Sequence, residues 1–155
     1  MSNVCCVLQL AKELVSHIKN QQLLSTVLQW LVYIAQKVFN LHFGYRFKWG
    51  VRGPYSRSLA KDLRAGSIHE KCICEENLKL SAIRDFLEDL KSVNIKLELA
   101  LEIAASYTML RYDVYPRPTD PLEELLKRKP NITLRDAQAV TKILSKYLFG
   151  LKEKA

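Results

Sequence analysis

The sequence predicts a single, mainly α domain with a small β hairpin. Its 155 residues are enough to bury a core without staples, and 48% hydrophobic with 26% charged residues is typical of a globular chain. Apolar residues recur every three or four positions over most of the chain, which indicates amphipathic helices. From Phe43 this period changes to two, which is the period of a strand.

Two helices are predicted before the strand. Apolar residues at helical spacing from Val4 to Ile18 predict a first helix that ends near Asn20. Ser25 and Thr26 are candidate caps for a second helix, whose apolar face is wide enough to lie at the centre of the core.

In the predicted strand, aromatic and basic side chains alternate between the two faces. One face carries Tyr45, Phe47, Trp49 and Val51, and the other carries Arg46, Lys48 and Arg52. Gly53 and Pro54 should end this strand, because proline donates no ladder hydrogen bond. Ser56 should then cap a helix, with Tyr55 packed beneath the turn.

The second half of the chain is predicted to be mostly helical. A short strand or wing is expected around Ile68 and residues 72–74, and Ser81 should cap the helix that follows. A longer helix follows Asn94 and ends at the PRPTDP segment, residues 116–121, where Pro121 suits the first turn of the next helix.

The last helix has a capping-box-like start. Thr133 and Asp136 form this pair, and the helix should run to Gly150. The predicted domain therefore covers residues 1–150, and residues 151–155 should form a frayed tail.

The four cysteines occur as two close pairs, residues 5 and 6 and residues 72 and 74. Free buried thiols are the favoured interpretation for Cys5 and Cys6, because cysteine packs as a small hydrophobe. Disulfides stay open, since intracellular proteins of hyperthermophiles contain them. No metal or other cofactor is expected, because adjacent cysteines are poor at supplying two tetrahedral ligands.

Three motifs together resemble a known family. LQWLVYIAQKV, then the aromatic-basic strand, then GPYSRSLAKDL resemble the YwgA-like proteins and the related Panacea (SocA-type antitoxin) domains, and the match extends from Leu28 to Leu144 with a gap around residues 72–74. The resemblance implies a compact, winged-helix-like helical domain from a prokaryote, virus or mobile element. Trp30 stands where the family usually has lysine, and the resemblance supplies no catalytic residues.

Charge is concentrated in residues 45–64. Six basic residues and Asp62 give this segment +5 of the formal net charge of +8; the six are Arg46, Lys48, Arg52, Arg57, Lys61 and Arg64. Such a segment favours a polyanion, because each neutralised phosphate releases counterions. The alternative is that these side chains only solvate the outer face of a hairpin whose aromatic residues form core.

Other candidate sites have simpler explanations. Ser56 lacks the sequence of a nucleophile elbow. Arg64 and His69 have the spacing of an Arg-x4-His ribonuclease motif, for which chance is the better explanation. Glu98, Glu102 and Asp113 should be solvated rather than bind a metal.

These observations favour a non-enzymatic nucleic-acid-binding or regulatory protein of the cytoplasm. The ligand could be DNA, RNA or a protein, and a homodimer is also open. The alternative function is an antitoxin or adaptor that binds a protein. No membrane partner is expected, because the most apolar segment, residues 27–35, is too short to cross a bilayer.

Overall fold

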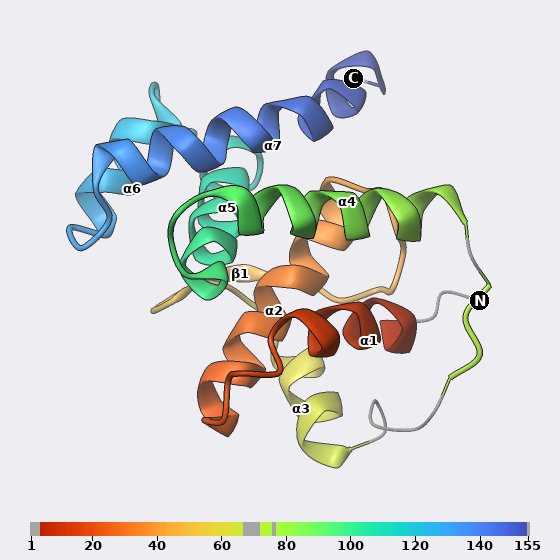
Figure 1. Cartoon of the computed structure of the whole chain (residues 1–155). Coiled ribbons are helices and arrows are strands. Elements are labelled where there is room, and N and C mark those ends of the chain that lie inside the picture. Colours follow the sequence, from red (N-terminus) through yellow and green to blue (C-terminus); the bar gives the residue numbers. More distant parts are fainter. Residues whose placement is uncertain (1–3, 67–71, 76, 155) are drawn as a thin grey trace.

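The fold is mainly helical, with one small hairpin (Figure 1). The computed structural model describes residues 4–66, 72–75 and 77–154. These residues form, in order, α1 (Val4–Leu14), α2 (Gln21–Lys37), β1 (Lys48–Gly50), β2 (Gly53–Tyr55), α3 (Arg57–Ala65), α4 (Leu78–Ser92), α5 (Leu97–Tyr112), α6 (Pro121–Arg128) and α7 (Leu134–Lys154). The predicted class, a mainly α domain with a small β hairpin, is confirmed.

Helices α2 and α5 pack against each other and contribute many buried residues to the core. Helix α2 also contacts α1, α3 and β2, while α5 contacts α4, α6, α7 and β2. Residues 27–35 of α2 are all buried. In α5, Ala100, Ala104 and Ala105 are fully buried, so these small side chains serve internal packing. Helix α7 lies across α4 and α5 on the opposite side from α1 (Figure 1).

The hairpin is tighter than the sequence predicted. Gly50 pairs with Gly53, so the chain turns at Val51 and Arg52, and the predicted strand end at Gly53 and Pro54 is wrong. Pro54 lies inside β2 opposite Trp49. Gly50 and Gly53 close a two-residue loop, so the next pair along the hairpin, Trp49 and Pro54, is a non-hydrogen-bonded pair. The missing N–H of Pro54 therefore costs no hydrogen bond between the strands.

The alternating faces of the predicted strand are only partly correct. Val51 is fully exposed at the hairpin tip, so it does not share an inward face with Trp49. Residues before Lys48 are not in a strand. Tyr45 there is held by α2 instead: its N–H donates to Gln36 Oε1 at 3.1 Å, and its carbonyl accepts from Gln36 Nε2 at 3.0 Å.

Two helix starts differ from the prediction because an asparagine precedes the expected cap. Asn20 Oδ1 accepts from the N–H groups of residues 22 and 23, so α2 begins before Ser25. Asn77 Oδ1 accepts from the Leu80 N–H at 2.9 Å, so α4 begins before Ser81. The first helix ends at Leu14, earlier than expected.

Three predicted helix starts are confirmed. Ser56 Oγ accepts from the Leu59 N–H at 3.2 Å, and Thr133 Oγ1 accepts from the Asp136 N–H at 3.1 Å. Pro121 is the first residue of α6. Helix α7 continues to Lys154, and fraying of residues 151–155 stays a prediction.

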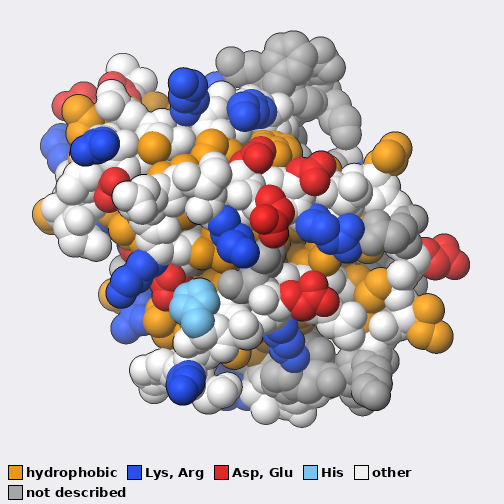
Figure 2. Space-filling model, in the orientation of Figure 1, with side chains coloured by type: hydrophobic (Ala, Val, Ile, Leu, Met, Phe, Trp, Pro, Cys, Tyr) orange, Lys and Arg blue, Asp and Glu red, His pale blue; other side chains and the backbone are white. Residues whose placement is uncertain are grey.

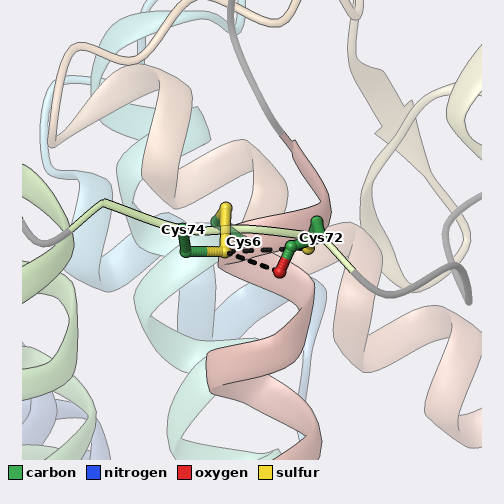
Figure 3. A group of neighbouring side chains, drawn as sticks. All are labelled: Cys6, Cys72 and Cys74. Atoms are coloured by element: carbon green, nitrogen blue, oxygen red, sulfur yellow. Dashed lines mark hydrogen bonds between the residues drawn. A yellow bond between two sulfur atoms is a disulfide. The ribbon is translucent and has the colours of Figure 1, made fainter.

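The cysteines join α1 to the segment before α4. Cys5 is bonded to Cys72. Cys6 is bonded to Cys74 (Figure 3). The prediction of free thiols is therefore wrong, because the pairing depends on a contact between segments 67 and 68 residues apart. Residues 72–75 have no regular secondary structure, so no strand forms there, and Ile68 lies outside the described residues.

Among the described residues, every helix is too short or too polar to cross a bilayer.

Candidate nucleic-acid interface

Buried polar groups of α2 fix the hairpin and the start of α3. Gln29 is 1% exposed, and its amide makes two hydrogen bonds of 2.9 Å with the backbone N–H and carbonyl of Ser56. Trp30 Nε1 donates to the Arg52 carbonyl at 3.1 Å. The hairpin tip and the first turn of α3 are therefore held from the core rather than by the hairpin alone.

Gly53 is required by its backbone and by its neighbours. Its φ of +109° is a conformation that side chains disfavour, and a Cβ there would lie 2.8 Å from Ser106 Oγ of α5. Within the GPYS sequence, Gly53 therefore permits close packing on α5, and Ser56 caps α3.

Tyr55 has no such structural role. The sequence predicted that it packs beneath the turn, but its side chain is 45% exposed. Successive residues of a strand point to opposite faces, and Pro54 is the one that points inward. Tyr55 thus stands on the outer face of the hairpin beside Lys48, its partner in the register.

Three of the six predicted basic residues meet at a single groove. Arg46, Lys48 and Arg57 line a hollow of about 550 Å³ between β1 and the start of α3. The same hollow is lined by Trp49, Gly50, Tyr55 and Ser58. We call this set of seven residues the hairpin groove. It combines cations, hydroxyl groups and aromatic rings on one surface.

The other three basic residues lie elsewhere. All six are exposed, but Arg52 lines a separate hollow with Thr26 and the hairpin tip. Arg64 lies beside the start of α2, and Lys61 stands on α3 one turn after Arg57. The sequence placed Arg46 and Arg52 on one strand face; the turn at residues 51 and 52 separates them.

The hairpin groove has a basic neighbour that the sequence reasoning missed. The guanidinium carbon of Arg128, at the end of α6, lies 5.2 Å from the centre of the Trp49 ring. Arg128 also pairs with Glu124 at 2.8 Å, which offsets its charge. The Lys-Arg-Lys run at residues 127–129 was visible in the sequence, but its approach to β1 depends on packing between distant segments.

A second hollow, of about 560 Å³, shares Arg46 with the hairpin groove and is dominated by a closed polar network. Asp113 accepts a hydrogen bond of 2.6 Å from the Tyr33 hydroxyl and pairs with Lys37 at 2.8 Å. Burial, and then the charge of Asp113, raise the pKa of Tyr33 well above its usual range. Because these groups satisfy one another, this hollow is a weaker candidate for ligand binding.

Tyr45 connects this region to α3. Its hydroxyl donates to Asp62 at 2.7 Å, and partial burial together with this hydrogen bond raises the pKa of Tyr45 to about 12. Tyr45 therefore joins the segment before β1 to α3 through the acidic residue of the basic segment.

The alternative sites from the sequence gain no support. Ser56 Oγ is buried in its capping role and lies 3.1 Å from Ser58 Oγ. Arg64 is exposed, whereas His69 lies outside the described residues, so the ribonuclease motif stays untested.

The three carboxylates suggested as a metal face are separate. Glu98 lies 3.6 Å from His17, Glu102 pairs with Lys129 at 2.8 Å, and Asp113 has the partners given above. All three are partly buried beside different groups rather than solvated as the sequence analysis expected, and Glu98 Oε1 accepts no hydrogen bond among the described residues.

Charge on the face around α1 and α4 has no single sign. Figure 2 shows lysine, arginine, aspartate and glutamate side chains intermingled there. The described residues of that face form no basic patch in this view.

Compared with protein-family models, curated proteins and solved structures, the chain matches none of them.

Proposed function

We propose that this is a non-enzymatic nucleic-acid-binding protein that docks phosphate groups in the hairpin groove. The observation that supports this best is the meeting of Arg46, Lys48 and Arg57 in one hollow with an exposed aromatic ring. Three cations around one concave surface neutralise neighbouring phosphates better than dispersed charges do, and each neutralised phosphate releases counterions.

The first turn of α3 adds to this electrostatic character. Ser58 lines the groove and lies in that turn, where backbone N–H groups carry the positive end of the helix dipole. Arg57 is the first residue of the same helix. Side-chain cations and the helix end therefore act on an anion from the same direction.

Tyr55 favours single-stranded over double-stranded ligands. An exposed ring beside phosphate-binding cations can stack on an unpaired base, which contributes about 1–3 kcal/mol per base. Inside a duplex the base faces are already stacked. We also propose that the protein acts in the cytoplasm and that it is related to the YwgA-like and Panacea proteins.

The decisive experiment compares two triple variants with equal loss of charge. Arg46→Ala/Lys48→Ala/Arg57→Ala empties the groove of cations. Lys91→Ala/Lys142→Ala/Lys146→Ala removes three exposed lysines from α4 and α7. Binding of a fluorescent single-stranded RNA and DNA is measured by anisotropy across a salt series.

We expect the groove variant to lose most of its affinity. Its log-log salt slope should become shallower by about 2, since each phosphate contact on a single strand contributes about 0.7. The lysine control should keep the wild-type slope. Equal losses in both variants, or no binding by the wild type, would show that the groove is not a phosphate site.

The base-stacking part has its own test. Tyr55→Ala should weaken single-strand binding roughly tenfold or more, and duplex binding much less. Because Tyr55 is exposed, this change should leave stability within about 0.5 kcal/mol of wild type. An equal effect on both ligands would remove the preference for single strands while leaving phosphate docking intact.

A protein partner is the second candidate function. Val51 is fully exposed at the hairpin tip, beside a hollow of about 420 Å³ lined by Thr26, Gln29 and residues 50–55. An exposed apolar side chain on a rigid turn suits an antitoxin or adaptor surface, or a homodimer contact. This alternative predicts binding with little salt dependence that is lost on Val51→Asp.

A further inference from the structure

The four cysteines form one cluster of sulfur atoms. Cys5 and Cys6 at the start of α1 are bonded to Cys72 and Cys74 of the facing segment. Figure 3 shows how Cys6, Cys72 and Cys74 lie together. The Sγ atoms of Cys72 and Cys74 lie 3.6 Å apart, and those of Cys6, Cys72 and Cys74 all lie within 4.8 Å of one another. Cys5 belongs to the same cluster through its bond to Cys72.

This cluster has the dimensions of a tetrahedral thiolate site. With zinc–sulfur bonds of about 2.3 Å, neighbouring sulfur atoms of a tetrahedron lie about 3.8 Å apart. The separation of 3.6 Å between Cys72 and Cys74 is close to this value. In the paired cysteines, Cα atoms 6.2 and 5.7 Å apart hold the two segments face to face.

The sequence objection to a metal site was that adjacent cysteines are poor at supplying two tetrahedral ligands. Here the segment 72–75 passes the first turn of α1 and meets both of them, so Cys5 and Cys6 each reach a partner on it. Two sulfur atoms thus come from a helix turn and two from a Cys-x-Cys segment.

We propose that, in the reduced protein, Cys5, Cys6, Cys72 and Cys74 together bind one Zn²⁺ ion, and that oxidation to the two disulfides releases it. Four thiolates in a tetrahedral arrangement select zinc among the common divalent metals. The same two segments are then joined in both states, by the metal when reduced and by disulfides when oxidised.

The two states differ by four electrons. In the forward direction, one cysteine thiolate of each pair attacks a small-molecule disulfide, forms a mixed disulfide and releases one thiolate. The second cysteine of the pair attacks the mixed disulfide, closes the protein disulfide and releases the other thiolate. Two small disulfides are reduced to four thiolates, two protein disulfides form, and Zn²⁺ leaves without a change of oxidation state.

The surroundings give reagents access from one side. Cys6 is 7% exposed and lies against the core, whereas Cys74 is exposed. An oxidant, a reducing thiol or a competing chelator should therefore react first at Cys74.

The test uses Co²⁺ as a spectroscopic probe for the zinc site. The full chain is reduced with a phosphine under nitrogen and titrated with Co²⁺. The proposal predicts one equivalent of bound Co²⁺ with thiolate-to-cobalt charge-transfer bands and tetrahedral d–d bands, both abolished by one equivalent of Zn²⁺. The oxidised chain should show neither.

The variant Cys6→Ser/Cys74→Ser removes one disulfide and two ligands, and should lose the tetrahedral thiolate spectrum. Circular dichroism of each sample checks that the helices persist, and the reduced wild type needs no substitution. Reduced wild type that gives no thiolate–cobalt bands would overturn the proposal. So would bands of equal strength in the Cys6→Ser/Cys74→Ser variant.

Discussion

Gly53 offers the sharpest test of how the hairpin is held against the core. Replacing it with alanine puts a Cβ 2.8 Å from Ser106 Oγ and 3.5 Å from Trp30 Nε1, at a φ of +109°. A left-handed backbone costs a non-glycine residue about 1–3 kcal/mol, and overpacking of a rigid contact costs about 1–3 kcal/mol. Gly53→Ala should therefore lower the free energy of unfolding by about 3–4 kcal/mol.

The magnitude can be divided between its two causes with a double-mutant cycle. Ser106 Oγ is fully buried, and no hydrogen-bond partner reaches it among the described residues. Ser106→Ala alone should thus be nearly neutral. In the Gly53→Ala background it removes the closest clash, because the next atoms, Trp30 Nε1 at 3.5 Å and Ser106 Cβ at 3.9 Å, lie at ordinary contact distances. About 1–2 kcal/mol should return, and the backbone strain should remain.

Urea denaturation followed by circular dichroism measures each corner of this cycle. For a chain of this size, Gly53→Ala should also lower Tm by about 10 °C, at roughly 2–4 °C per kcal/mol. Additivity of the two changes within about 0.5 kcal/mol would refute the contact with Ser106. A stable Gly53→Ala variant would refute both the contact and the strained backbone.

Three further changes probe the polar groups around the groove. Gln29→Leu leaves the buried Ser56 N–H without its partner, while the Ser56 carbonyl keeps its bond from the Ala60 N–H, so the change should destabilise the protein by about 1–3 kcal/mol in urea denaturation. Lys129 and Glu102 form a largely buried ion pair, so Lys129→Ala leaves the Glu102 carboxylate without its cation and should cost about 3 kcal/mol in the same assay. Replacing both residues with apolar ones, Lys129→Met/Glu102→Leu, should recover most of this loss. Because the pKa of Tyr45 is raised in the folded state, Tyr45 stabilises the fold below about pH 10, and this contribution is lost as the pH rises towards 12. In Tyr45→Phe, the free energy of unfolding should therefore decrease less between these two pH values than it does in the wild type.

Matched changes control for these effects. Gln22→Ala alters an exposed glutamine of the same helix and should stay within about 0.5 kcal/mol of wild type. A cost for Gln29→Leu no larger than that would contradict the role of its amide. If Lys129→Met/Glu102→Leu does not recover stability, the loss in Lys129→Ala comes from packing rather than from the unpaired carboxylate. If the free energy of unfolding depends on pH in the same way in the wild type and in Tyr45→Phe, the Tyr45 prediction is wrong.

The sequence predicted those features that depend on neighbours along the chain. The fold class, the caps at Ser56 and Thr133 and the helix start at Pro121 follow from local backbone chemistry, and the structure confirms them. Two residues near the start of α2 are suited to cap it, Asn20 and Ser25. Asn20 is the cap, because the helical pattern extends back to Gln21.

Features that depend on distant contacts were missed. The disulfides need α1 to lie beside residues 72–75, and no spacing along the chain shows this. The exposure of Tyr55 depends on where the hairpin turns, which is set partly by the fit of Gly53 against α5. The six predicted basic residues are all exposed, but only the fold shows that Arg46, Lys48 and Arg57 share a groove.

The most direct test of the central claim locates the nucleic acid on the protein. A single-stranded RNA containing 4-thiouridine is photocrosslinked to the wild-type chain, digested with trypsin and analysed by mass spectrometry. Tyr55 lies in the tryptic peptide of residues 53–57, and Trp49 lies in the one before it. Tyr115 is 70% exposed and is not one of the seven residues that line the groove, so it provides an aromatic control. We predict adducts concentrated in the two hairpin peptides; adducts at Tyr115 without adducts at residues 49–57 would contradict the claim.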